Sequence, residues 1–371
     1  MSRPFHRPVS VALIALACAC ASARSSELAL AAPDSGFAEL IERLSETGGF
    51  FPSDNLVSNE TSYLHIMGVL KKLGVSGGAY IGVGPDQNFT YIAHVRPEMA
   101  FIIDIRRDNM LHHLMFKALF ENARNRIEYL SMLVGRPPPR GLSRWDGASI
   151  RKIVDYIDAT PADSQRFERT AELVRTTIEG LGVKLTEHDY RTIKQIHRAF
   201  RDRGLDIQYS WGSRYPTYRQ LLLETDLEGN LGHYLASEES FRFIKELQRR
   251  NRIIPVVGDL SGPHALAAIG IEIEKRDLTI SAFYASNVEQ YLMRGSAFQQ
   301  FAKTMTGMPY DERSIIIRSY FGRWGGHVNA KAGHLSTQLL ERFEDFVAET
   351  EAGGYRSYTD LVTKNVLPPR P

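Results

Sequence analysis

The chain has 371 residues, of which 43% are apolar and 24% charged, so it is long enough and apolar enough to bury a substantial core. This composition excludes a disordered chain. The formal charge of +2 gives no electrostatic reason to expect a nucleic-acid partner.

Residues 1–23 have the composition of a secretory signal. Arg3 and Arg7 precede a short apolar run, and the small residues ASA stand directly before Arg24, as at a cleavage site. The run is too short to span a bilayer as a stable helix, and a buried N-terminal strand is the alternative. Cleavage would remove two of the 45 basic residues and none of the 43 acidic ones, leaving a neutral chain without a transmembrane helix.

We therefore expect an exported protein that is either periplasmic or anchored to the membrane as a lipoprotein through Cys18 or Cys20. The sequence ALAC ending at Cys18 suggests lipidation, although its leucine is one position too close to the cysteine. A cytoplasmic protein is the alternative if the segment is not a functional signal. Both cysteines of the chain lie in this segment, so the mature protein would have no disulfide, zinc–thiolate site or cysteine nucleophile.

After a linker over 24–36, alternating apolar runs and amphipathic segments predict an α/β protein. Most of the apolar runs are separated by helical segments, which indicates a mainly parallel sheet covered by helices on both faces. The predicted strands are 79–83, 100–104, 252–257, 278–286 and 314–320.

The stretch 107–249 is helical and charged, and it predicts a large helical insertion between the second and third strands. We expect a last helix over 335–351 and no further strand hairpin after Tyr320. The predicted organisation is a Rossmann-like domain in two parts, 37–106 and 250–320, with the insertion between them and a C-terminal helical extension over 321–371.

Polar residues follow the ends of four predicted strands. In an open parallel sheet, ligands bind beyond the carboxyl ends of the strands, so these residues predict the site. They are Gly82, Gly84, Asp86, Gln87 and Asn88 after the first strand, Asp104 and Arg106 after the second, Asp259 and Ser261 after the third, and Tyr284, Ser286 and Asn287 at the fourth.

Three of these strand ends suggest an adenosine-type ligand. Glycines let the backbone approach a ligand closely, and Asp104, about 20 residues further on, is placed to bind ribose hydroxyls. Asp259 follows the third strand, where a carboxylate can meet an adenine amino group. Ordinary loop polarity is the alternative for each residue taken alone.

The pattern resembles the class I S-adenosylmethionine-dependent methyltransferases. The segments GVGPDQNFTYIA, DIRRDN, PVVGDLSGP and FYASNVEQYL, with others over about residues 50–320, are similar to a family of bacterial proteins of that fold. The resemblance implies S-adenosylmethionine as the cofactor. It further implies a cofactor loop at Gly82 and Gly84, a ribose contact at Asp104 and an adenine contact at Asp259. It implies no particular methyl acceptor.

The sequence departs from the methyltransferase pattern in the glycine loop. Tyr80 stands where an acid is usual, and Asp86 stands at the third glycine position, after Pro85. A loop carboxylate repels pyrophosphate, which disfavours a nucleotide-linked oxidoreductase, but it suits the cationic sulfonium and amino groups of S-adenosylmethionine. Alternatively, Asp86 only caps the next helix.

Candidate catalytic residues are Glu60, Tyr284, Asn287 and His327. The polar stretch 53–63 suggests a lid that brings Glu60 to the ligand, or else a cap in which Asn59 begins the following helix. His327, in GRWGGH, is a candidate base. HExxH, G-x-S-x-G and P-loop motifs are absent. The sequence therefore predicts a methyltransferase-like protein, with an exported, non-catalytic protein that binds a small ligand or a partner as the alternative.

Overall fold

The computed structural model describes residues 36–209, 214–322 and 326–368, all within a unit that spans residues 33–371. The predicted signal, both cysteines and most of the predicted linker lie outside the described residues. Among the described residues, no helix combines the length and the apolar composition needed to cross a bilayer.

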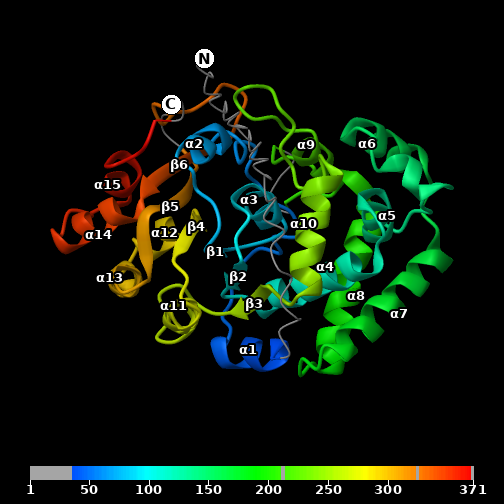
Figure 1. Ribbon diagram of the computed structural model, residues 1–371, viewed down its shortest axis with the longest axis horizontal. Helices are drawn as coiled ribbons and strands as arrows, with labels where there is room; N and C mark the ends of the chain where they lie inside the picture. The colour runs from blue at the N-terminus through cyan, green and yellow to red at the C-terminus, as the bar shows by residue number, and fades with distance from the viewer. Residues whose placement is uncertain (1–35, 210–213, 323–325, 369–371) are drawn as a thin grey trace, which may run out of the picture. The chain divides into compact units, whose positions relative to one another are not determined.

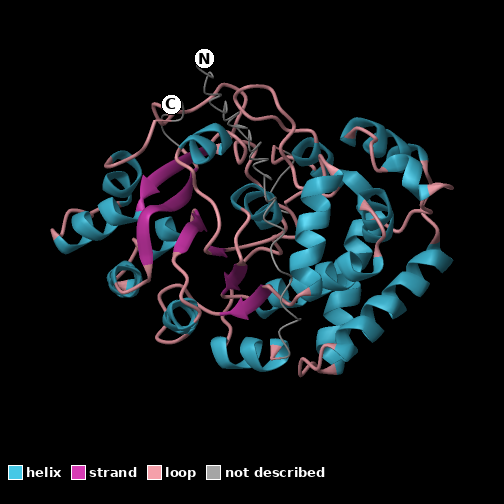
Figure 2. Cartoon of the chain, viewed as in Figure 1, coloured by secondary structure: helices cyan, strands magenta, loops and turns pink. Residues whose placement is uncertain are grey.

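The central element of the fold is a six-stranded sheet with the order β3-β2-β1-β4-β5-β6 (Figures 1 and 2). Neighbouring strands from β3 to β5 are parallel, and β6 runs antiparallel to β5 at the edge. The strands are β1 (Ala79–Gly82), β2 (Met99–Asp104), β3 (Ile253–Val257), β4 (Ile280–Ser286), β5 (Tyr310–Tyr320) and β6 (Thr337–Arg342). The predicted mostly parallel α/β sheet is confirmed, because β1 to β5 coincide with the five predicted strands.

The predicted helix over 335–351 is wrong in its first part. Residues 337–342 form β6, and only α14 (Phe343–Glu351) is helical. Leu339 and Leu340 are both buried, and Leu340 pairs with Ile317 of β5. The segment TQLLER has only two apolar residues, Leu339 and Leu340, and they are adjacent, so it shows no periodicity that separates a buried strand from a helix. The contacts with the sheet therefore decide its conformation. The sheet therefore ends in an antiparallel strand that the sequence did not reveal.

The chain between β2 and β3 is largely helical, and its helices do not form a layer separate from the sheet. α4 contacts β2 and β3 and also α7, α8 and α10, and its apolar residues belong to one core shared with the sheet. The helices and 3-10 segments are α1 (Phe37–Leu44), α2 (Met67–Lys72), α3 (Gln87–Val95), α4 (Arg107–Asn122), α5 (Arg126–Leu133), η1 (Leu142–Trp145), α6 (Ile150–Ala159), α7 (Ser164–Gly180), α8 (Glu187–Arg203), η2 (Gly204–Asp206), α9 (Tyr218–Leu222), α10 (Glu238–Arg249), α11 (Ala265–Lys275), α12 (Val288–Leu292), α13 (Ala297–Thr306), α14 and α15 (Tyr358–Thr363).

The strand order reverses between β1 and β4. The chain adds β2 and β3 on one side of β1, then returns to place β4 on its other side. Gly82 pairs with Ile102 of β2 and Tyr284 of β4, so the carboxyl ends of the three strands lie at one edge of the sheet. In open α/β sheets this switch point is where a crevice forms. Of the predicted site residues, those after β1 and at the end of β4 lie at this position, where Gln87 donates to Tyr284.

Candidate functional site

The turn after β1 is held by the side chain of Asn88, near the start of α3. Its amide nitrogen donates to the carbonyl oxygens of Val83 (2.9 Å) and Pro85 (2.7 Å), and its amide oxygen accepts from the Tyr80 hydroxyl (2.9 Å). A β-carbon on Gly82 would collide with Asn88 and Tyr80. The packing of Asn88 and Tyr80 therefore explains why residue 82 is a glycine, without a bound ligand.

Gly84, two residues later, has open space beside it. Its φ of +82° lies in the left-handed region, and no atom lies within 4 Å of the place a β-carbon would take. Nε2 of His113 lies 2.9 Å from the Gly84 carbonyl oxygen. Because a carbonyl oxygen only accepts, Nε2 carries the proton and Nδ1 is left as an acceptor.

Buried polar atoms without a partner gather on the first turns of α4. Among the described residues they include both amide atoms of Asn109, Nε2 of His112 and Nδ1 of His113. Asn109 and His113 are four residues apart and share a helix face. Burial lowers the pKa of His113 to about 4, so its ring is neutral at physiological pH. Since buried polar groups are nearly always hydrogen-bonded, this face suits a ligand or an ordered water.

Asp86 precedes α3, but its side chain does not cap that helix, so the capping alternative is wrong. Its Oδ2 accepts hydrogen bonds from the hydroxyls of Tyr218 (2.7 Å) and Tyr234 (3.1 Å). Burial raises the pKa of Asp86 to about 6, and the two hydroxyls act in the opposite direction. No basic side chain forms an ion pair with Asp86 in the part of the chain that the structure describes.

Glu60 lies at the centre of a buried polar cluster at the switch point. Its Oε2 accepts from Nε2 of Gln87 (2.8 Å) and Nε2 of Gln338 (2.6 Å), and its Oε1 accepts from the Ser286 hydroxyl (2.6 Å). The residue is 1% exposed. All three donors are neutral, and no described Lys, Arg or His forms an ion pair with this carboxylate. A buried carboxylate without a cation attracts positive charge strongly.

The predicted segment 53–63 does reach this edge of the sheet. Ser58 donates to the Gln87 side chain, and Tyr63 is buried, with its hydroxyl donating to the Leu221 carbonyl oxygen (2.7 Å). Asn59 does not begin a helix, because α2 starts at Met67, so that alternative is wrong.

Tyr284, at the carboxyl end of β4, joins the same cluster. Its hydroxyl accepts from Nε2 of Gln87 (2.9 Å), which also donates to Glu60. Burial raises its pKa well above the usual value, so the phenol stays protonated. Ser286 has a φ of +50°, which is uncommon for a residue with a β-carbon. Such backbone strain gathers at functional sites.

Asp104 and Arg106, at the end of β2, bind each other. Arg106 Nη2 lies 2.8 Å from Asp104 Oδ2, and Arg106 Nε lies 3.0 Å from Oδ1. The guanidinium also donates to the carbonyl oxygens of Ser53 (3.0 Å) and Asp54 (2.8 Å). A cavity of about 640 Å³ lies beside Arg106, lined by residues 49–54 and 106–108. That volume is in the usual range for small-molecule sites.

The turn after β3 is occupied by the protein's own groups. Asp259 Oδ1 accepts from the backbone nitrogen and the hydroxyl of Ser261, each at 2.8 Å. Glu46 accepts from the backbone nitrogens of Asp259 (2.9 Å) and of His264 and Ala265 (both 3.1 Å), the residues that begin α11. Glu46 thus accepts hydrogen bonds from backbone N–H groups at the start of α11 that have no partner within the helix.

The two remaining predicted residues, Asn287 and His327, differ in whether their side chains are free to bind a ligand. Asn287 is half-buried at the start of α12, and its side chain has no hydrogen-bond partner among the described residues. His327 uses both ring nitrogens: Nε2 donates to the Val362 carbonyl oxygen (2.8 Å) and Nδ1 accepts from the Asn329 nitrogen (3.1 Å). His327 is therefore tied to the C-terminal segment.

Sequence reasoning missed several residues of this site, including Tyr218 and Tyr234, which bind Asp86. Gln338 lies on β6, which the sequence suggested to be helical, so nothing placed it near Glu60. Asn109 and His113 lie in the helix that directly follows β2. Their position just after a strand end could have indicated that they are near the site. No described group of three or more His, Asp or Glu side chains is arranged to hold a metal ion.

One family model matches most of the chain. It is the family described as a domain of unknown function (DUF7790), and it matches residues 55–136 and 150–366. The matched residues include Glu60, the glycine turn, the strand ends and Gln338. No curated protein matches the chain.

Proposed function

The chain belongs to the DUF7790 family, and we propose that it binds S-adenosylmethionine, or a related cationic adenosyl ligand, at the carboxyl edge of its sheet as a methyltransferase-like protein. The strand order and the reversal between β1 and β4 support this proposal, because Rossmann-like folds with this order bind adenosyl groups in the crevice at that point.

The observation that carries the proposal is the buried Glu60 carboxylate, which has only neutral donors around it. Asp86, directly before the helix that follows the glycine turn, is a second buried carboxylate without a basic partner among the described residues. Two such groups favour a ligand with two positive centres. S-adenosylmethionine has a sulfonium and an amino group, whereas a pyrophosphate would be repelled.

The adenosine half of the ligand has a place beside β2. Arg106 lines the cavity of about 640 Å³ and holds the carboxylate of Asp104, the last residue of that strand. Ribose hydroxyls would then meet the Asp104–Arg106 pair at the edge of this cavity. The loop after β3 is less available, because Glu46 occupies it.

When bound, S-adenosylmethionine supplies an electrophilic methyl group. In this proposal, Glu60 and Asp86 bind the positive charges, and Asn287, whose side chain is free, orients an acceptor. His113 Nδ1 is a buried, unprotonated acceptor beside Gly84, and it positions a donor group of the ligand. Tyr284 holds Gln87 in place, and Gln87 in turn donates to Glu60.

A protein that binds the ligand without catalysis is the second candidate. The observation in its favour is that Glu60, Tyr284 and His327 are all engaged in hydrogen bonds within the protein. None of the three is a free base, and methyl transfer to a protonated acceptor needs one.

Isothermal titration calorimetry with S-adenosylmethionine, S-adenosylhomocysteine and NAD tests the proposal. We expect heat of binding with the sulfur ligands and none with NAD. Asp104→Ala should abolish binding, whereas Asp155→Ala, on the exposed face of α6, should not. The absence of binding to folded wild-type protein would refute the proposal. Binding without methyl transfer to any acceptor in a panel would favour the second candidate.

A further inference from the structure

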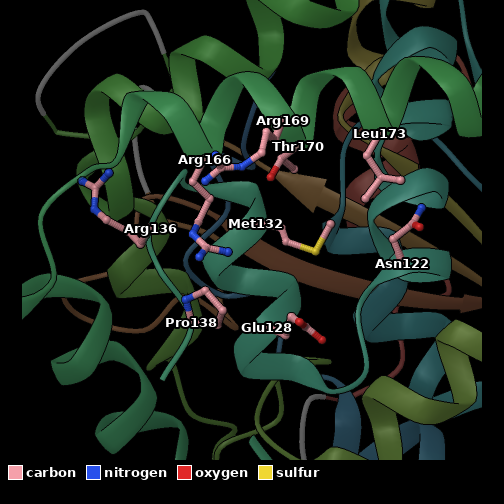
Figure 3. Close-up of a pocket in the computed structure, with 9 residues that line it drawn as sticks. All are labelled: Asn122, Glu128, Met132, Arg136, Pro138, Arg166, Arg169, Thr170 and Leu173. Carbon is pink, nitrogen blue, oxygen red and sulfur yellow. The ribbon is translucent and has the colours of Figure 1, made fainter. Parts of the chain in front are cut away.

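A second cavity lies within the helical region, between α5 and α7 (Figure 3). It has a volume of about 240 Å³ and contains none of the residues of the sheet-edge site. Its walls include Glu128 and Met132 of α5, Arg136 after that helix, and Arg166 and Arg169 of α7. Three of the lining residues are therefore arginines, and one is an acid.

Arg166 and Arg169 lack partners within the described residues. Neither guanidinium forms a hydrogen bond or an ion pair there, and Nε of Arg166 is buried. The two residues stand three apart on α7, so their side chains lie on one helix face, where like charges destabilise the helix. Figure 3 shows Arg166 extending from α7 toward Met132 and Pro138. Arg166 is half-buried and Arg169 is exposed, so both guanidinium groups have N–H donors available for a bound anion.

The acidic residue at the cavity does not neutralise the positive charge of the arginines. Glu128 is already bound by Arg124, with Nη2 2.8 Å and Nε 2.9 Å from its carboxylate oxygens. Nη1 of Arg136 donates to the carbonyl oxygens of Val134 (2.8 Å) and Arg201 (3.2 Å), while its Nε is buried without a partner. Burial lowers the pKa of the Arg136 guanidinium. The cavity therefore carries net positive charge.

From this arrangement we propose that the cavity binds a small dianionic oxyanion, as inorganic phosphate or as the phosphate of a small monoester. Guanidinium groups recognise the tetrahedral oxygens of phosphate through paired N–H donors. The cavity is smaller than most sites for drug-sized molecules, which suits a single phosphate group. Arg166 and Arg169 lie in the first two turns of a 17-residue helix, whose N-terminal dipole adds to the attraction.

Calorimetric titration of the full chain with inorganic phosphate and with glycerol phosphate tests this site, with chloride at matched ionic strength as reference. We expect saturable binding of at least one phosphate, weakened at least about tenfold in an Arg166→Gln/Arg169→Gln variant. Arg151→Gln, an exposed arginine on α6, should bind as the wild type does. The stronger ligand of the two distinguishes the free ion from the ester.

Thermal unfolding provides a second readout. Without phosphate, the double variant should be at least as stable as the wild type, because two unpaired like charges are gone. If the double variant does not fold, Arg169→Gln, at an exposed position, replaces it and should still weaken binding. No saturable phosphate binding by the wild type, or equal binding by the variant, would overturn the proposal.

Discussion

The hydroxyl of Ser286 donates to the carboxylate of Glu60 across 2.6 Å, although the two residues are 226 positions apart in the chain. The bond joins the segment before the first strand to the left-handed turn that ends β4. It closes the polar cluster at the switch point of the sheet. The same contact links a strained backbone position to a buried carboxylate that has no basic partner among the described residues.

Substitutions at Ser286 should separate the hydrogen bond from the backbone strain. Ser286→Ala loses a bond to a carboxylate, which costs about 1.5–3 kcal/mol, and keeps the β-carbon in the left-handed region. Ser286→Gly loses the same bond but relieves about 1 kcal/mol of strain. Urea unfolding should therefore find the glycine variant more stable than the alanine variant. The reverse order would show that the turn stores no strain.

Replacing Asp86 should change how stability depends on pH. Its folded pKa of about 6 lies above the ordinary value near 3.8, so its contribution to stability is present below pH 4 and is lost as pH rises through 6. Two units correspond to about 3 kcal/mol. Relative to the wild type, Asp86→Asn should gain about that much unfolding free energy between pH 4 and pH 8, measured by urea titration at each pH.

Tyr218→Phe provides the complementary variant. It removes a hydroxyl that stabilises the ionised Asp86, so the loss of stability toward pH 8 should become steeper than in the wild type. Parallel pH profiles for all three proteins would mean that Asp86 does not titrate in this range.

The two glycines of the turn should respond differently to alanine. Gly82→Ala places a β-carbon against Asn88 and Tyr80, and overpacking of this kind costs about 1–3 kcal/mol or more. Gly84→Ala meets open space, so only its positive φ is penalised, by about 1–2 kcal/mol, partly offset in the unfolded chain. Chemical denaturation should find Gly82→Ala the less stable variant.

The affinity for the ligand should depend more on Gly84 than on Gly82. Gly84→Ala fills the space beside the glycine turn and should weaken binding of S-adenosylmethionine in a protein that is still folded. A Gly84→Ala variant with unchanged affinity would place the ligand elsewhere.

The sequence was sufficient for the parts of the fold that depend on local patterns. Runs such as IIPVV and ISAFYAS are apolar enough to predict buried parallel strands, and the helical insertion followed from its periodicity. Residues 337–342 were mispredicted because a six-residue segment with a single pair of leucines is compatible with either conformation. Only its pairing with β5 decides between them.

The sequence could predict which residues of the site follow the strands, but not which other residues contact them. Polar residues after parallel strands must gather at one edge of the sheet, which brings Asp86, Gln87, Tyr284 and Ser286 to the same region. Their partners come from distant parts of the chain, such as Tyr218 and Gln338, and no local pattern announces them. For the same reason, the occupation of the β3 turn by Glu46 was not foreseen. Asp104 and Arg106 are only two residues apart, but the sequence does not show that their side chains bind each other.

The most direct test of the account is calorimetric titration of S-adenosylmethionine into the wild type and into Glu60→Gln at pH 7.5. Glutamine keeps the size of the side chain and removes its charge, so circular dichroism and unfolding should show a folded protein. The account predicts saturable binding by the wild type and an affinity at least about tenfold lower in the variant. Equal affinities, or no binding by the wild type, would contradict it.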